Sequence, residues 1–356
     1  MKKIMLSAYV NNNLGDDLFL KILCERFPYI KFIIFTPQKT VFLKSFNNLH
    51  ASTIGYYIDE ISYKIFRRLF ATKILSFFVN SHVHIGGSLF IENDKWKRKF
   101  HKYSLKVNSF SNNFLLGCNF GPFKKDEYLN SYKELFKVFN DISFRDTKSL
   151  KLFHDIDNAR VSPDIVLSYS NNYEKTPKSI GISIINLSDR KELLEKEEIY
   201  LNNLKEIIIN YASKGYTIKL FSFCEEEGDL TAANNLLNRV SYLSDEVEIV
   251  NYSGDIDYFL KEFNSMEIVV ASRFHAMILG LVQSSSVIPI AYSEKMINTL
   301  DDLKYEGTVK SIKSLFENDY EEIIFSLEKE NNLIDMTRYS QEAKQHFKIL
   351  DKHLKE

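Results

Sequence analysis

The stretch EIVVASRFHAMILGLVQ, residues 267–283, combines two kinds of secondary structure. Its first part, Glu267–Ala271, is a short apolar run that is typical of a buried strand. Its second part, Phe274–Gln283, has the apolar spacing of a helix. A strand that leads through a short polar loop into a helix is the repeating unit of α/β proteins. The stretch therefore predicts a mostly parallel sheet with covering helices.

The same alternation continues along the 356 residues. We predict further helices at 126–139, 193–213 and 229–240, and two helices within 320–356. The predicted strands, in chain order, are Lys3–Val10, Lys31–Thr36, His82–Ile85, Phe114–Asn119, Ile142–Arg145, Val161–Leu167, Ser179–Ile185, Thr217–Phe223, Val247–Asn251, Glu267–Ala271 and Ser286–Ala291. Five or six strands in each half predict an α/β fold of two Rossmann-like, doubly wound domains that face a cleft.

The polar segment 168–178 separates the two halves, because it has no aliphatic residue to bury and contains Pro177. We therefore predict an N-terminal domain at 1–170. The C-terminal domain, 178–356, would carry the loop around Arg273 and the C-terminal helices.

The composition excludes several classes of protein. Lys plus Arg number 46 against 47 Asp plus Glu, so the chain has no global charge that favours nucleic acid. The three cysteines lie far apart, which argues against a disulfide framework and a structural zinc site and favours a reducing compartment.

The apolar start of the chain is interrupted by polar residues from Asn11 onward, and no long uncharged run follows. We expect a cytoplasmic protein, and leave open a peripheral association with the inner face of the membrane.

Loops beyond the carboxyl ends of parallel strands are the usual ligand sites of such sheets. The loop 8–17 contains Gly15, which permits a tight turn, and Asp16, which can cap a helix; a bare turn explains it equally well. The pair Gly86-Gly87 can direct backbone N–H groups at an anion, or simply form a sharp strand exit. A similar exit follows at 117–122.

Two arginines are predicted at strand ends, Arg145 and Arg273. The chain has only ten arginines beside 36 lysines, so lysine supplies its ordinary surface charge. The guanidinium fork matches a carboxylate or phosphate in a way that an ammonium group cannot. Both arginines are therefore candidates for binding an anion.

His275 follows Arg273 at the predicted start of a helix. A helix N-terminus favours an anion, and an imidazole can transfer a proton near neutral pH. The alternative is that His275 only caps the helix and that Arg273 makes an internal ion pair.

The motifs together resemble the polysaccharide pyruvyl transferase family over residues 4 to 300. They are Asn13-Leu-Gly-Asp16, Gly86-Gly87, Gly117-Cys-Asn-Phe-Gly-Pro122, Ser143-Phe-Arg-Asp146, Pro163-Asp164 and Ser272-Arg-Phe-His275, supported by Glu227-Gly-Asp229 and by Tyr292 with Lys295. The family usually has Arg-Leu-His where this chain has Arg-Phe-His, a change that keeps an apolar spacer.

The resemblance implies a fold similar to that of GT-B glycosyltransferases, with the N-terminal domain, 1–170, on the acceptor side. It also implies transfer of pyruvyl from phosphoenolpyruvate to hydroxyls of a cell-surface glycan or a lipid-linked precursor, as a ketal, with no cofactor and no metal. The tripeptides Asp155-Ile-Asp157 and Asp255-Ile-Asp257 are interpreted as polar turns rather than metal ligands.

The resemblance and the strand-end positions give the candidate residues. The catalytic candidates are Arg145, Arg273 and His275. The substrate-binding candidates are Asn13, Gly15, Asp16, Gly86, Gly87, Ser88, Asn119, Ser272, Tyr292 and Lys295.

Two other functions stay open. One is a GT-B glycosyltransferase that uses a nucleotide sugar, although the chain has no GxGxxG motif. The other is a glycan-binding family member without activity. A homo-oligomer is also left open. The basic stretch Lys95–Lys99, which contains Trp96, is either a solvated helix face or a contact for an acceptor or a membrane.

Overall fold

The structure is a computed structural model that describes residues 2–169, 173–188, 190–243, 245–329 and 334–355. The chain divides into two compact units. Unit 1 consists of Met1–Val10, Asp16–Ser168 and Gln341–Glu356, and unit 2 consists of Asn11–Gly15 and Tyr169–Ser340.

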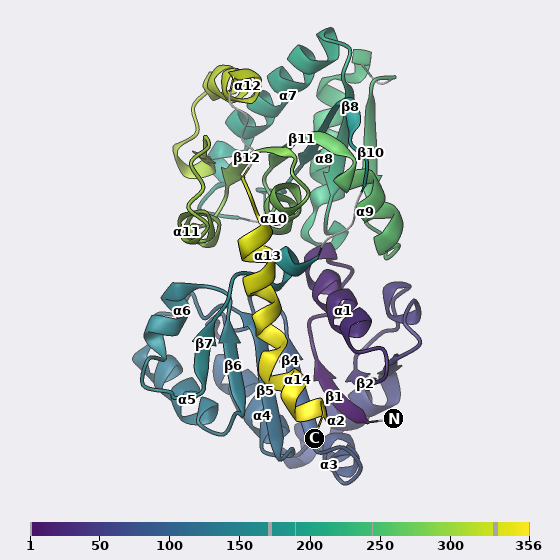
Figure 1. The fold of residues 1–356 in the computed structure, drawn as a ribbon, viewed down its shortest axis with the longest axis vertical. Coiled ribbons are helices and arrows are strands. Elements are labelled where there is room, and N and C mark those ends of the chain that lie inside the picture. Colours follow the sequence, from purple (N-terminus) through teal and green to yellow (C-terminus); the bar gives the residue numbers. More distant parts are fainter. Residues whose placement is uncertain (1, 170–172, 189, 244, 330–333, 356) are drawn as a thin grey trace. The chain divides into compact units, whose positions relative to one another are not determined.

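Unit 1 contains a seven-stranded parallel sheet (Figure 1). Its strands are β1 (Lys3–Ser7), β2 (Lys31–Phe35), β3 (Leu49–Ser52), β4 (Ser81–Ile85), β5 (Asn112–Cys118), β6 (Asp141–Phe144) and β7 (Ala159–Val161). Their order is β3-β2-β1-β4-β5-β6-β7, the doubly wound order in which the sheet reverses direction next to β1. The register pairs Leu6 with Ile34 on one side and with Val83 on the other, and all three side chains are buried.

The helices between these strands cover the sheet because their apolar stripes need burial. They are α1 (Leu14–Arg26), α2 (Thr53–Phe66), α3 (Phe70–Ser76), α4 (Trp96–Val107), α5 (Asp126–Phe136) and α6 (Thr147–Leu152). One core cluster of unit 1 is rich in aromatic side chains, among them Phe120, Tyr132 and Phe136.

Unit 2 repeats the same topology with six parallel strands. They are β8 (Thr176–Ser183), β9 (Thr217–Ser222), β10 (Val247–Asn251), β11 (Met266–Ala271), β12 (Ser286–Ala291) and β13 (Lys310–Ser311), in the order β10-β9-β8-β11-β12-β13. The register places Val270 of β11 between Ile182 and Ile288, all of them buried, which explains why these strands have nearly continuous apolar sequences.

The helices of unit 2 enclose a largely aliphatic core. They are α7 (Glu197–Ser213), α8 (Asp229–Arg239), α9 (Ile256–Asn264), α10 (Phe274–Val282), α11 (Glu294–Asp302) and α12 (Asp319–Lys329); α13 (Thr337–Ala343) continues across the boundary toward unit 1. The decisive stretch 267–283 forms β11 and α10, as predicted.

The predicted strand Val161–Leu167 is wrong beyond its first residue. The strand β7 ends at Val161, and Ile165–Ser168 form a 3₁₀ turn with buried apolar side chains. Pro163 has no N–H for a sheet ladder, and the Asp164 carboxylate accepts a hydrogen bond from the Val166 N–H at 2.9 Å. The apolar run is thus buried in a turn.

The C-terminal segment differs from the predicted domain 178–356. Residues 341–356, including α14 (Lys348–Lys355), belong to unit 1. His353 is 2.8 Å from the hydroxyl of Ser81 through its Nε2, and His346 donates a hydrogen bond to the Pro163 carbonyl. An amphipathic pattern shows that a helix needs a partner but does not show which sheet supplies it.

Among the described residues, no helix is long and apolar enough to cross a membrane.

Candidate active site

The loop after β11 is anchored to the neighbouring strand β8. The backbone N–H groups of Ser272 and Arg273 donate hydrogen bonds to the Ser183 hydroxyl at 2.9 and 3.1 Å. Ser183 is the last residue of β8, and the sheet reverses its winding between β8 and β11. The loop therefore lies at the point where open α/β sheets bind ligands.

Ser272 is fully buried and holds this loop in place. Its hydroxyl accepts a hydrogen bond from the Tyr200 hydroxyl at 2.8 Å, and Tyr200 accepts one from the Ile185 N–H. Burial raises the pKa of Tyr200 well above its ordinary value, so the phenol stays protonated as a donor. The contacts of Ser272 give it a positioning role, and its predicted role in substrate binding stays a prediction.

Arg273 is the N-cap residue of α10 and is nearly buried. Its Nη1 pairs with Glu227 at 2.5 Å, and its Nη2 pairs with Asp229. The Asp229 side chain is completely buried and also accepts from the backbone N–H groups of Phe223 and Cys224. The internal ion pair that we considered as an alternative for Arg273 is present. In the described part of the chain the Nε atom of Arg273 has no hydrogen-bond partner.

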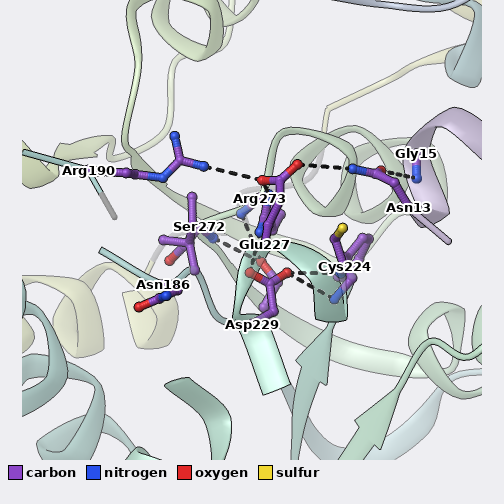
Figure 2. Close-up of polar contacts among 12 residues, drawn as sticks. Asn13, Gly15, Asn186, Arg190, Cys224, Glu227, Asp229, Ser272 and Arg273 are labelled. Atoms are coloured by element: carbon purple, nitrogen blue, oxygen red, sulfur yellow. Dashed lines mark hydrogen bonds and ion pairs between the residues drawn. The ribbon is translucent and has the colours of Figure 1, made fainter. Parts of the chain in front are cut away.

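Glu227 connects several parts of the site (Figure 2). Besides Arg273 it contacts Arg190 at 3.3 Å and accepts a hydrogen bond from the Asn13 amide at 3.4 Å. Its side chain is 41% exposed, unlike that of Asp229. Burial raises the pKa of Glu227, but Arg273, Arg190 and Lys295 lower it further, so the net shift is downward. Glu227 is therefore an ionised carboxylate at neutral pH.

Two cations lie near the ring of Tyr292. The Arg190 guanidinium is 4.7 Å from its ring centroid, and the Lys295 ammonium is 5.4 Å away. Burial raises the pKa of Tyr292, but Lys295, Arg273 and Arg190 outweigh burial and bring it below its ordinary value. Among the described residues, the printed ion pairs join Arg273 and Arg190 to two carboxylates, Glu227 and Asp229. We call these two carboxylates, the three cations and Tyr292 the β11 site, and its three cations and two carboxylates sum to one positive charge.

His275 lies in the first turn of α10, against Gly15 in the first turn of α1. A Cβ atom added to Gly15 would be 1.8 Å from Nδ1 of His275. The start of α1 is held by the Leu14 N–H, which donates to the Phe223 carbonyl, and by the Gly15 N–H, which donates to the Asn13 side chain. Position 15 therefore requires glycine, because any side chain there would collide with the imidazole of His275.

Unit 1 has a second cluster, which we call the Arg145 cluster. Arg145 pairs with Asp164 at 2.9 Å, and its Nη2 donates to Asn119 at 2.6 Å and to Ser88 at 3.3 Å. A Cβ atom on Gly87 would be 2.5 Å from the guanidinium. The segments that follow β4, β5 and β6 thus lie together, because residues after β4 and β5 contact the buried Arg145 that follows β6.

The remaining candidates of unit 1 shape loops. Gly86 has a φ of +149°, in the region that favours glycine. Asp146 caps α6 by accepting a hydrogen bond from the Ser149 N–H at 2.7 Å. Asp16 lies in the first turn of α1.

The structure brings the sequence-predicted residues together in two groups, one in each unit. Asn13, Gly15, Ser272, Arg273, His275, Tyr292 and Lys295 belong to the β11 site, and Gly87, Ser88, Asn119 and Arg145 to the Arg145 cluster. Convergence of Arg145 with Arg273 and His275 on one molecule stays a prediction.

Sequence reasoning missed Arg190 and gave Glu227 and Asp229 no role in the site. The signal for Arg190 was available, because it is one of only ten arginines and follows a predicted strand. Among the described residues, no group of three or more His, Cys, Asp or Glu side chains could hold a metal ion.

Comparison with solved structures shows likeness over the whole chain. A putative UDP-N-acetylglucosamine 2-epimerase from Listeria monocytogenes has a TM-score of 0.64 at 10% identity, covering 99% of this chain and 96% of that one. The MnaA–UDP structure from S. aureus has a TM-score of 0.61 at 11% identity, with coverages of 100% and 96%. MurG from Acinetobacter baumannii has a TM-score of 0.52 at 13% identity, with coverages of 97% and 95%. At such identities the likeness shows the fold alone, and it confirms the predicted GT-B-like class.

A comparison with curated proteins gave no match. The sequence profile of one family, described as polysaccharide pyruvyl transferase, matches residues 13–294. This match covers most of the chain and includes the residues of both clusters except Lys295, which follows its last residue. The chain therefore belongs to the polysaccharide pyruvyl transferase family.

Proposed function

We propose that this protein transfers pyruvyl from phosphoenolpyruvate to hydroxyls of a cell-surface glycan or its precursor, and forms a ketal. The observation that carries the proposal is the positive β11 site at the N-terminus of α10, within a family member. Phosphoenolpyruvate carries a carboxylate and a phosphate, and a helix N-terminus flanked by guanidinium groups favours both anions.

Because Glu227 is half-exposed, an anionic group of the donor could take its place on the two guanidinium groups that it contacts. Its carboxylate occupies Arg273 and Arg190 in the absence of another anion. An anion of the donor would replace Glu227 on these guanidinium groups, while the buried Asp229 keeps Arg273 in position. Arg190 and Lys295, which both lie near the Tyr292 ring, would hold the second anionic group.

His275 is the candidate for proton transfer in this reaction. The donor methylene carbon gains a proton, one hydroxyl attacks the adjacent carbon and phosphate leaves, and a second hydroxyl then closes the ketal with loss of its proton. We assign His275 to proton transfer at the departing phosphate or at an attacking hydroxyl, because it lies in the first turn of α10 beside Arg273. General acid–base catalysis of this kind contributes about 10² to 10⁴-fold.

The test incubates the protein with phosphoenolpyruvate and a panel of glycan precursors. We expect release of phosphate together with an acid-labile product whose mass has increased by one pyruvyl ketal. His275→Ala should abolish turnover with its fold intact, whereas His154→Ala, an exposed histidine of unit 1, should not change it. No phosphate release with any acceptor, and no binding of phosphoenolpyruvate by calorimetry, would refute the proposal.

A nucleotide-sugar glycosyltransferase is the second candidate, because similar folds have been solved with UDP. The two candidates differ in the ligand that binds the native state. A ligand that binds only this state raises the melting temperature. Phosphoenolpyruvate should therefore stabilise the protein and UDP should not; the reverse result would favour the glycosyltransferase.

A further inference from the structure

Helix α2 has its polar and apolar faces inverted. It buries Asp59, Ser62 and Tyr63 together with Gly55. Six large apolar side chains are exposed instead: Ile54, Tyr57, Ile58, Ile61, Ile65 and Phe66. Most of them recur every three or four residues, so they lie on one side of the helix. The apolar stripe of α2 therefore faces outward.

The buried polar face of α2 is satisfied by α3, which packs against it (Figure 1). The Asp59 carboxylate accepts hydrogen bonds from the N–H of Thr72 at 3.1 Å and from its hydroxyl at 2.5 Å. The Ser62 hydroxyl donates to the Arg68 carbonyl and accepts from the Phe70 N–H. These bonds fix the helix pair with its polar side inward, because a buried carboxylate without partners would be costly. The outward direction of the apolar stripe is thus built into the fold.

Helix α3 and the two residues after it extend this surface. Phe70, Ile74, Phe77 and Phe78 are exposed, the last two at 74% each. The rings of Phe66 and Phe70 stack at 5.5 Å and join the two helices. We call these ten side chains the α2–α3 apolar face. They are half of the twenty exposed large apolar side chains found among the described residues, and such a concentration marks an interaction surface.

Basic side chains border the α2–α3 apolar face. The hydroxyl of Tyr63 donates to the Arg98 carbonyl at 3.2 Å, so the start of α4 lies beside α2. Segments 53–78 and 95–107 hold ten Lys and Arg against two acidic residues, a net charge of +8 in a chain of net charge −1. The exposed basic residues are Lys64, Arg67, Arg68, Lys73, Lys95, Lys97, Arg98 and Lys99.

We propose that the α2–α3 apolar face and its basic border dock this protein on an anionic phospholipid bilayer. Exposed aromatic and branched aliphatic side chains would enter the boundary between headgroups and acyl chains. The lysines and arginines around them would remain at the anionic headgroups, since long basic side chains reach a polar interface from an apolar surface. Because this border is positively charged, its charge favours an anionic lipid surface as the partner.

A second copy of the chain fits this surface less well. Two identical surfaces that meet about a two-fold axis bring the same charges together. Here the basic borders would oppose each other, and like charges at an interface are unfavourable. The bilayer is therefore the partner that the structure favours.

Sedimentation with lipid vesicles tests the proposal. The full chain is mixed with vesicles of phosphatidylcholine alone, or of phosphatidylcholine with phosphatidylglycerol, at rising salt. We expect binding only to the anionic vesicles, weakening with salt. Lys64→Glu with Lys73→Glu should lower the partition coefficient at least about fivefold for each residue. The triple variant Ile61→Ser, Ile65→Ser and Phe77→Ser should lower it at least about tenfold.

The matched control replaces three exposed apolar residues of unit 2, Leu194, Tyr258 and Phe325, by Ser and should bind like the unmodified protein. Fluorescence of the single tryptophan, Trp96, checks that unit 1 of each variant is folded. Equal binding by the folded triple variant, or no binding to anionic vesicles, would overturn the proposal. A dimer that the triple variant dissociates would instead identify a second copy as the partner. None of these outcomes depends on the donor or on His275, so a failure here leaves the proposed reaction standing.

Discussion

Unit 1 and unit 2 each bury an arginine where a parallel strand ends, Arg145 after β6 and Arg273 after β11. The ion pair described for Arg145 joins it to a completely buried carboxylate, Asp164, and its guanidinium also donates to the side-chain oxygens of Asn119 and Ser88. Arg273 pairs with a buried carboxylate and also with Glu227, which is half-exposed and shared with Arg190. In unit 1 the arginine at the strand end therefore forms a closed ion pair, in which both side chains are buried. In unit 2 the equivalent arginine forms an open ion pair, in which another anion can replace the partly exposed carboxylate.

The largest effect that tests this comparison is expected at Asp164. The substitution Asp164→Ala leaves the buried Arg145 charge without its carboxylate. Breaking a buried ion pair by removing one partner costs about 3–5 kcal/mol. Urea unfolding followed through Trp96, which lies in unit 1, measures the loss. As a control, Glu134→Gln removes the partner of the exposed Lys137 and should cost less than about 1 kcal/mol. A similar small loss for Asp164→Ala would contradict the structural role of this ion pair.

The stability of the two units should also respond differently to a fall in pH. Seven of the eight histidines lie in unit 1, and burial lowers the pKa of His82 and of His346 to about 3 from an ordinary 6.5. Nearby Lys106 and Arg160 add to these shifts. Below pH 6.5 the unfolded chain binds protons that the folded unit cannot. Stability therefore falls as the pH drops toward 3, by roughly 2 kcal/mol for each histidine at about pH 5.

Hydrogen exchange followed by mass spectrometry reads the two units separately as the pH is lowered. Peptides of β1, β4 and β5 should lose protection before peptides of β8 and β11. His154→Gln, at an exposed position, should leave the profile unchanged. Loss of protection in unit 2 first would contradict the assignment of the acid-sensitive groups.

Substitution of two glycines should affect turnover in one unit and stability in the other. Gly15 lies against His275, and Gly87 lies against Arg145. Gly15→Ala must displace the imidazole, so we expect turnover in the pyruvyl-transfer assay to fall by about 10²-fold. Gly87→Ala presses on a guanidinium that its ion pair holds in place, so we expect a loss of stability.

A double variant separates the effect of Gly15→Ala on His275 from a general disturbance. If the alanine acts only through the imidazole, adding it to His275→Ala should cause no further loss of turnover. An additional loss in the double variant would show that Gly15 acts by another route.

The sequence predicts much of this comparison, for physical reasons that also explain what it misses. Buried parallel strands have continuous apolar sequences, so β11 and the exits that carry Arg145 and Arg273 could be located. The partners of these arginines could not be, since Asp164 and Asp229 reach them through tertiary folding. Periodicity does not show which sheet receives a helix, as with α14. It also does not show which face of a helix is outside, as with α2, whose polar face is buried only because Thr72 and Phe70 pair with it.

The smallest expected change in stability is at Glu227. Glu227→Gln removes a half-exposed carboxylate, while Asp229 remains as the buried partner of Arg273. The free energy of unfolding should therefore change by less than about 1 kcal/mol. If donor anions replace Glu227 on the guanidinium groups, its neutralisation removes a competitor, and the KM for phosphoenolpyruvate should fall by about fivefold. Glu226→Gln, at the exposed neighbouring residue, is the matched control and should leave KM unchanged.

A rise in KM for Glu227→Gln would have a different meaning. It would show that Glu227 orients Arg190 for the donor instead of yielding its place to it, because Arg190 would then lose its anchor. A loss of stability as large as that expected for Asp164→Ala would show that the ion pairs of Arg273 are as closed as that of Arg145. The contrast between the two arginines therefore depends on Glu227. Its exposed carboxylate lets an incoming anion compete with it, whereas Asp164, the carboxylate described for Arg145, is completely buried.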